Sequence, residues 1–224
     1  MSTAPDLRLA AMLQPEERAA LHAAGIPIRY DVGATLFSEG EQTDHVVLIK
    51  AGRVKVVSAG HGGQEVILGI RGPGDMVGEM SPIDGASRSA TAVAITPVEA
   101  SVVRAGDFKA FLLGHPHVQW LLLVQMAGRL RDADRRRVDI VTTGVASRVA
   151  RCLLDLARAD VDNVGRPTPL VSDVSQQEIA ALVGASREAV SKALQGFRLG
   201  GLIELARRHV AIIDPEGLEA LTRS

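Results

Sequence analysis

Residues 175–198 read SQQEIAALVGASREAVSKALQGFR, and this stretch decides the fold of the C-terminal part. Ser175 and Glu178 have the spacing of a capping box, in which each side chain accepts a hydrogen bond from the other residue's backbone. The apolar residues that follow repeat at helical spacing, namely Ile179, Leu182 and Val183. Gly184 then favours a turn. The pattern predicts a short helix that ends at Gly184.

A second helix is predicted to begin at Ser186, whose hydroxyl can cap it. Its inward face is expected to carry Val190, Leu194 and Phe197, and its outward face Arg187, Glu188, Ser191 and Lys192. Arg and Lys can donate to guanine O6 and N7, and Glu can accept from cytosine N4, so this outward face suits the major groove of DNA. The two helices form a helix-turn-helix. The alternative is an ordinary helical hairpin whose charged face is only solvated.

Two β-prone runs follow, at residues 202–203 and 210–213, with Arg207, Arg208 and His209 between them. Two such runs around a basic turn predict a β-hairpin. A helix-turn-helix followed by a basic hairpin is the winged-helix plan. We expect Arg207 and Arg208 at the tip of the wing, near DNA backbone phosphates.

The composition is that of a globular protein with a core: 46% of the 224 residues are hydrophobic and the net charge is −1. The single Cys152 lies in an apolar helical stretch, which indicates a core residue and excludes a disulfide within one chain. The N-terminal residues have no signal-peptide pattern, and no run of about 18 uncharged apolar residues occurs. We therefore expect a cytoplasmic protein with no membrane partner.

From residue 28 to about residue 104 the chain has short β-prone runs, each punctuated by Gly or Asp-Gly. They include residues 35–37, 46–49, 54–57, 66–68 and 98–103. Many short strands at such spacing predict a sandwich or barrel.

After Pro116 only Gly128 interrupts a helical pattern that runs to Val141, which predicts a helix of about 25 residues and roughly 37 Å. Its first half carries an apolar stripe, and its second half is rich in Arg and Asp. A parallel copy from a second subunit would cover the stripe, so a homodimer is expected. The alternative is that this helix packs only on its own β-domain. Gly144 then marks a hinge before another helix at residues 146–159.

Residues 72–91 are too rich in glycine for plain strand. One strand is expected to end at Gly78 and Glu79 and the next to begin at Arg88 and Ser89, so the loop between them brings all four residues together. Gly78 lets backbone N–H groups approach a ligand, Arg88 and Ser89 suit phosphate oxygens, and Glu79 can accept from a sugar hydroxyl. This set suits a ribose phosphate. The alternative is a turn-rich loop with an Arg–Glu salt bridge.

Gly78-Glu79 followed by Arg88-Ser89-Ala90-Thr91 resembles the phosphate-binding cassette of cyclic-nucleotide-binding β-rolls. With the long helix and Ser186-Arg187-Glu188, the chain resembles the cyclic-AMP receptor protein (CRP/FNR) family of bacterial transcription regulators. The resemblance implies an α+β fold. It comprises a cyclic-nucleotide-binding β-roll (a double-stranded β-helix or jelly roll) at 1–114, a long dimerisation helix and hinge at 115–143, and a winged helix-turn-helix at 144–224.

The same resemblance implies that Glu79 holds the ribose 2′-OH while Gly78, Arg88 and Ser89 hold the cyclic phosphate of cAMP or a related effector. It also implies that Arg187, Glu188 and Lys192 read bases of palindromic double-stranded DNA with TGTGA-like half-sites. Ser175, Gln177 and Ser186 match positions that contact phosphates, and RNA polymerase is a further implied partner.

The chain departs from the family pattern at two places. Ala133 and Asp134 stand where members that bind cAMP have a Thr-Ser or Thr-Asn pair that contacts adenine, which puts adenine specificity in doubt. Lys192 matches a position that is Arg in some members, and Lys offers a point donor where Arg offers a fork.

Three rival classes remain open on the residues alone. A cupin-type metalloenzyme would use His115 and His117, but no Glu follows at the required interval and no metal is expected. A DNA-binding regulator could use its β-roll only as a scaffold, without a ligand or with a different one. A redox sensor is disfavoured because the chain has a single cysteine. We expect a non-enzymatic, homodimeric regulator controlled allosterically by a cyclic nucleotide.

Overall fold

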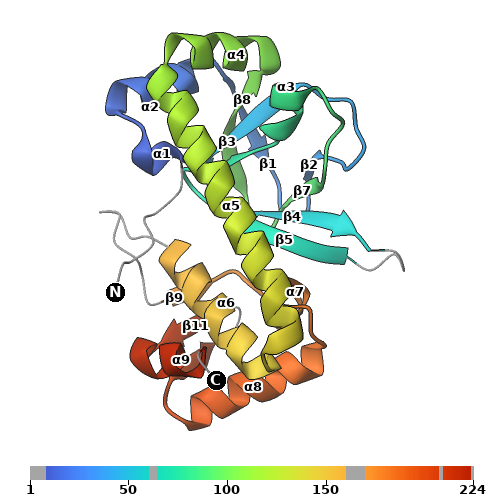
Figure 1. Cartoon of the computed structure of the whole chain (residues 1–224), viewed down its shortest axis with the longest axis vertical. Helices are drawn as coiled ribbons and strands as arrows, with labels where there is room; N and C mark the ends of the chain where they lie inside the picture. The colour runs from blue at the N-terminus through green and yellow to red at the C-terminus, as the bar shows by residue number, and fades with distance from the viewer. Residues whose placement is uncertain (1–8, 61–64, 160–169, 207–208, 223–224) are drawn as a thin grey trace. The chain divides into compact units, whose positions relative to one another are not determined.

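The computed structural model describes residues 9–60, 65–159, 170–206 and 209–222 (Figure 1). The chain divides into two compact units, Met1–Arg131 and Asp132–Ser224. The division falls within the longest helix. Each unit is described by itself below.

The first unit is built on two four-stranded antiparallel sheets, with strand orders β1-β8-β3-β6 and β2-β7-β4-β5. The first sheet comprises β1 (Ile26–Tyr30), β8 (Val98–Arg104), β3 (His45–Ala51) and β6 (Met76–Val77). The second comprises β2 (Thr35–Phe37), β7 (Thr91–Ala94), β4 (Val54–Ala59) and β5 (Glu65–Arg71). The short runs predicted a sandwich or a barrel, and the structure has the sandwich, with two sheets around a shared core.

The run Val46 to Ile49 is apolar without interruption because β3 is buried on both faces. Val47 and Ile49 belong to a core cluster that draws residues from both sheets. Val46 and Leu48 point the other way, into a second cluster whose remaining members come mainly from helices. Alternation along one strand therefore links the inter-sheet core to the helical layer.

The helical layer of the first unit covers the outer face of the first sheet (Figure 1). It consists of α1 (Leu9–Met12), α2 (Pro15–Ala23), α4 (Ala105–Gly114) and the first part of α5 (Pro116–Thr142). Phe108 of α4 and Val118 of α5 are fully buried in the cluster. Within this unit the long helix thus packs its Val118 and Leu122 face on its own β-domain.

The segment expected to be a simple loop between Glu79 and Arg88 contains a short helix, α3 (Met80–Asp84). Gly85, at φ +75°, ends this helix in the left-handed conformation that glycine adopts without strain. The flanking strands are also shorter than expected, since β6 ends at Val77 and β7 begins at Thr91. Gly78, Glu79, Arg88 and Ser89 therefore lie in the connections beside the strands.

Helix α5 has 27 residues and ends at Thr142, and α6 (Val145–Ala159) begins three residues later, as the helical pattern and Gly144 predicted. The second unit continues with β9 (Leu170–Ser172), α7 (Gln176–Val183), α8 (Arg187–Leu199), β10 (Ile203–Ala206), β11 (His209–Ile212) and α9 (Pro215–Leu221). Its sheet has the order β10-β11-β9 and is antiparallel.

The winged helix-turn-helix is confirmed: α7 and α8 bury the predicted Ile179, Val183, Val190, Leu194 and Phe197, and β10 and β11 form the hairpin. His209 is the first residue of β11 and pairs with Ala206. Arg207 and Arg208 lie outside the described residues. Within the described parts of the chain, no helix is both long and apolar enough to cross a membrane.

Candidate functional site

Arg88 lies just before β7, is only 2% exposed, and donates hydrogen bonds from all three of its side-chain nitrogens. Its Nε donates to Thr43 Oγ1 at 2.6 Å, its Nη1 to the Gly78 carbonyl at 2.6 Å, and its Nη2 to the His45 carbonyl at 2.7 Å. These bonds replace the water that a buried guanidinium loses. The position of the cation is therefore fixed by the protein.

The ring of Phe37 and the backbone of Gly78 complete this environment. The guanidinium carbon of Arg88 lies 4.2 Å from the centroid of the Phe37 ring, which is a cation–π contact. Gly78 has φ +79°, and a Cβ there would lie 2.5 Å from Arg88 Nη1 and 3.0 Å from the Phe37 ring. Only glycine leaves room for this arrangement. We refer to Phe37, Thr43, His45 and Gly78 as the Arg88 socket.

Burial lowers the pKa of Arg88 from its ordinary value, and the neighbouring carboxylates of Glu41, Glu79 and Asp44 act in the opposite direction. An arginine starts so far above neutral pH that it stays a cation. The socket therefore holds a permanent positive charge, which an anionic ligand can match.

Glu79, the second residue of the cassette (residues 78–91), is 4% exposed and comes directly before α3. Its partner is Arg129 of α5, whose Nη1 donates to Glu79 Oε1. Arg129 Nη2 also donates to the Met76 carbonyl at 3.0 Å. The salt bridge between Glu79 and Arg88, considered as an alternative from the sequence, is not among the bonds of either residue.

Arg129 was not predicted as a site residue. One signal could have found it: it lies four residues after Gln125 on the face of α5 that carries buried Val118 and Leu122. A basic residue that continues a buried face needs an acidic partner. The sequence does not say which acid, because the two residues are 50 positions apart.

Ser89 is exposed at the edge of the cassette, and its hydroxyl donates to Met80 Sδ at 3.8 Å. Ala133 and Asp134 belong to the second unit and are exposed on α5, where Asp134 forms an ion pair with Arg137 at 3.6 Å. Gly78, Glu79, Arg88 and Ser89 thus lie at the two ends of one connection between β6 and β7, and Arg88 contacts Gly78 across it. The contact of Ala133 and Asp134 with a base stays a prediction.

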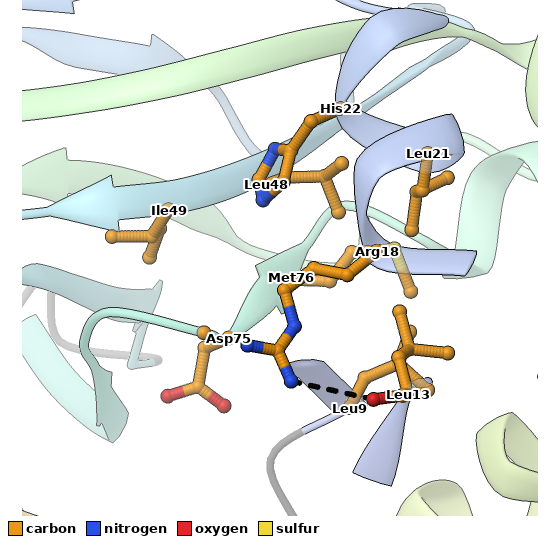
Figure 2. Close-up of a pocket in the computed structure, with 10 residues that line it drawn as sticks. Leu9, Leu13, Arg18, Leu21, His22, Leu48, Ile49, Asp75 and Met76 are labelled. Carbon is orange, nitrogen blue, oxygen red and sulfur yellow. Dashed lines mark hydrogen bonds between the residues drawn. The ribbon is translucent and has the colours of Figure 1, made fainter. Parts of the chain in front are cut away.

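A small cavity lies elsewhere in the first unit, between α1, α2, β3 and β6 (Figure 2). Its volume is about 20 Å³, and His22 and Arg18 point toward it. A cavity of about 10–15 Å³ on this measure holds one water molecule, so this space is far too small for a nucleotide. The cavity is therefore not the ligand site.

The start of each helix of the helix-turn-helix is capped as the sequence predicted. Ser175 Oγ accepts from Glu178 N at 3.2 Å, and Glu178 Oε2 accepts from Ser175 N at 2.7 Å. Gly184 has φ +62°, and Ser186 Oγ accepts from Ala189 N at 3.2 Å. The caps fix where the outward-facing residues of α7 and α8 begin.

The side chains predicted to meet DNA bases are exposed on α8, namely Arg187, Glu188 and Lys192. Gln177 and Ser186 are also exposed, and Ser175 is half-buried. A groove of about 340 Å³ runs between the starts of these helices and the wing, lined by residues that include Ser175, Gln177, Arg187, Ala206 and His209. The helices and the hairpin therefore line one groove, with Ser175, Gln177 and Arg187 among its residues.

The cysteine and the two histidines on which the alternative hypotheses depend have contacts within the protein. Burial, with Asp155 nearby, raises the pKa of Cys152 to about 12, so the thiol stays protonated at neutral pH. His115 contacts the Phe111 carbonyl at 2.8 Å, and His117 contacts Glu17 at 3.2 Å. Among the described residues no group of three or more metal-ligating side chains occurs.

A β-roll with a buried cationic cassette, followed along the chain by a long helix and a winged helix-turn-helix, is the architecture of a DNA-binding transcription regulator. Two family models match the chain: a cyclic nucleotide-binding domain at residues 27–115 and a Crp-like helix-turn-helix domain at residues 147–221. The chain belongs to the CRP/FNR family of transcription regulators. These proteins are not enzymes, so the hypothesis of a cupin-type metalloenzyme is wrong.

Relatives and a solved structure agree with this assignment. The chain is 37% identical to the CRP-like cAMP-activated global transcriptional regulator of Mycobacterium tuberculosis, over 94% of each chain. It is 34% identical to the cyclic AMP receptor protein of Thermus thermophilus, over 86% of each. The structure of FixK2 from Bradyrhizobium japonicum matches with a TM-score of 0.78 at 22% identity, covering 88% of this chain and 96% of that one, which supports the fold.

Proposed function

We propose that this regulator works as a homodimer controlled by a cyclic nucleotide, with cAMP as the first candidate. The observation that carries the proposal is the Arg88 socket, where a guanidinium that is 2% exposed is held by Thr43, Gly78 and His45, in the segment that also carries Glu79 and Ser89. A fixed, desolvated guanidinium binds a phosphate more strongly than one in water. The relative at 37% identity, named as cAMP-activated, supports the choice of effector.

The proposed dimer uses the exposed side of α5. Trp120, Leu123 and Leu130 are 65%, 58% and 63% exposed, and they recur at intervals of three and seven residues along the helix. This spacing is that of one seam of a parallel coiled coil. A second copy of the chain, with its α5 parallel to the first, would cover the stripe.

In the proposed mechanism, effector binding shifts the dimer between two arrangements for which the effector has different affinities. One arrangement would set the two α8 helices about 34 Å apart, the spacing of successive major grooves. Arg187, Glu188 and Lys192 would read bases of TGTGA-like half-sites. Ser175, Gln177, Ser186, Arg207 and Arg208 would contact phosphates, and RNA polymerase in the cytoplasm would be the further partner.

A second candidate is a regulator whose β-roll binds no ligand. The internal bonds of Arg88 and the ion pair of Glu79 favour it, because three N–H groups of Arg88 and the Glu79 carboxylate already have partners within the protein. A ligand must then add to these contacts or replace them.

Calorimetric titration of cAMP and of cGMP into the purified chain separates the candidates. Saturable binding of one nucleotide per chain, with a gain in affinity for a palindromic DNA site, is the expected result. Sedimentation of the same samples should give a mass of two chains. Absence of heat with both nucleotides, with unchanged DNA affinity, would favour the scaffold candidate.

A further inference from the structure

Three groups accept hydrogen bonds from the Arg88 guanidinium, and one of them, the Thr43 hydroxyl, belongs to a side chain. The other two acceptors are main-chain carbonyl oxygens, of Gly78 and His45. The Thr43 hydroxyl accepts from Nε at 2.6 Å. A substitution at position 43 can therefore remove one acceptor of the guanidinium while both carbonyl acceptors stay in the backbone.

The loop that carries Thr43, residues 38–44 between β2 and β3, is tied to Arg88 through the backbone as well. Gly40 N donates to the Arg88 carbonyl at 2.9 Å, and Arg88 N donates to the Glu41 carbonyl at 2.9 Å. Thr43 follows two residues after this anchor and directly precedes Asp44 and the start of β3. The hydroxyl is thus held at a fixed place relative to the guanidinium.

A guanidinium has five N–H groups, and the three bonds within the protein use one on each nitrogen. Two N–H groups remain, one on Nη1 and one on Nη2. Two donors match the two non-bridging oxygens of a phosphodiester anion. We propose that Thr43 is a positioning residue for the effector's phosphate, which holds Arg88 so that these two terminal N–H groups meet it.

The inference rests on the proposed binding of a cyclic nucleotide and adds a residue that selects the geometry of the phosphate contact. Without the hydroxyl, Nε–H would be left without an acceptor in a buried site, which is unfavourable. The guanidinium would turn, and a bound phosphate would accept from Nε in place of a terminal nitrogen. Both the affinity and the preference between the two non-bridging oxygens would then change.

The test uses the full chain and three variants. Thr43→Val keeps the shape and removes the acceptor, and Thr43→Ser keeps the hydroxyl. Thr96→Val is the matched control, because Thr96 Oγ1 accepts from Arg53 N at 2.8 Å near the opposite end of β3. The probes are cAMP and the Sp and Rp diastereomers of adenosine 3′,5′-cyclic phosphorothioate, which differ in the non-bridging oxygen that sulfur replaces.

For Thr43→Val we expect cAMP affinity to fall about tenfold and the Sp/Rp affinity ratio to change by about threefold or more. Thr43→Ser should stay within about twofold of the parent in both quantities, and so should Thr96→Val. A purely structural role would lower affinity for all three probes equally. The changed ratio is the signature of a displaced guanidinium.

An unchanged ratio in Thr43→Val, with or without a loss of affinity, would overturn the positioning role while leaving cyclic-nucleotide binding intact. A parent chain that binds none of the three probes would overturn the proposed function and, with it, this inference. Melting temperatures of all variants show whether they fold. If Thr43→Val does not fold, Thr43→Ala is judged by the same ratio.

Discussion

Arg129 and Glu79 form a buried ion pair that joins the long helix α5 to the residue expected to hold the ribose. Arg129 also donates to the Met76 carbonyl at 3.0 Å. Met76 belongs to β6, and the cassette begins directly after this strand. A carboxylate that is 4% exposed needs a partner, because desolvation disfavours its charged form. The pair therefore couples the position of the cassette to that of α5 within the first unit.

Replacing Arg129 by Ala should destabilise the first unit by about 2 kcal/mol, because a buried carboxylate is left without its cation. Urea unfolding followed by Trp120 fluorescence measures the loss. Arg135→Ala is the control, since Arg135 and Asp132 form an exposed pair at 3.7 Å whose removal should cost less than about 0.5 kcal/mol. Equal midpoints for the two variants would show that the buried pair contributes nothing.

Replacing Arg88 by Ala should weaken cyclic-nucleotide binding by about 2 kcal/mol or more, through loss of a charge-assisted bond to phosphate. Calorimetry measures the affinity, and circular dichroism checks that the winged helix-turn-helix still folds. Arg29→Ala serves as a control, because Arg29 of β1 is exposed and forms an ion pair at 2.8 Å with Glu99 of β8. A variant lacking Arg88 that binds as tightly as the parent would show that the cassette assignment is wrong.

On the DNA side, Arg187→Ala and Lys192→Ala should each cost about 1–3 kcal/mol on a palindromic site and little on random DNA. Arg207→Ala should instead weaken both and reduce the salt dependence. Anisotropy titrations at two salt concentrations measure these quantities, and Arg198→Ala, in the last turn of α8, is the control. Equal losses on both DNAs for Arg187→Ala would mean that it contacts phosphate alone.

Whether a feature could be predicted from the sequence depends on how far apart in the chain the residues that form it lie. The helix-turn-helix was predictable because Ser175, Gly184 and Ser186 act on backbone groups three or four residues away. The cassette residues were predictable as a group, but their partners were not. Arg88 reaches Thr43 across 45 positions, and Glu79 reaches Arg129 across 50. Contacts of that kind depend on how the sheets pair, which no local pattern states.

Short elements were missed for a related reason. Helix α3 has five residues, too few to show a period. Helices α1, α2, α4 and α9 and strands β1 and β9 were likewise not predicted as such, whereas β6 and β7 were expected but are shorter than the sequence indicated. Their boundaries depend on the cores they complete.

Acidification should destabilise the fold through His22 and His45. Burial lowers the pKa of both residues below 6.5, with Lys50 and Arg18 adding to the effect at His22 and Arg88 at His45. Below about pH 6.5 the unfolded chain takes up protons that the folded chain does not, so the free energy of unfolding falls as pH falls. Above that pH the imidazoles are neutral in the folded and the unfolded chain, so this loss of stability is absent.

Urea midpoints at pH 7.5 and 5.5 test the effect of His22. The parent should lose more stability between these values than His22→Gln, which has no imidazole to protonate. His209→Gln, at an exposed position of β11, is the control and should behave like the parent. An equal loss in parent and His22→Gln would exclude His22 as a source of the pH dependence.

Ala133 and Asp134 raise the question of which base the effector carries. Ala133 has no hydrogen-bonding side chain, where the family pattern has Thr. Losing one neutral hydrogen bond costs about 0.5–1.5 kcal/mol, and up to about 3 if an adenine amino group is buried unpaired. Asp134 can accept from the adenine amino group or from the guanine N1 and N2 donors. Its ion pair with Arg137 at 3.6 Å is exposed and so competes weakly with a base.

We therefore expect this chain to bind cAMP weakly or with little preference over cGMP, with phosphate and ribose contacts supplying most of the affinity. The measurement is titration of cAMP and cGMP into the parent and into the double variant Ala133→Thr with Asp134→Ser. The variant should gain affinity for cAMP by several-fold to about a hundredfold, since one to two hydrogen bonds are restored, and should gain less for cGMP. Asp132→Ser, two residues before Asp134 in the same exposed stretch, controls for the lost charge. Submicromolar, strongly cAMP-selective binding by the parent that stays the same in the double variant would contradict the prediction, because the base would then be recognised by residues other than these two.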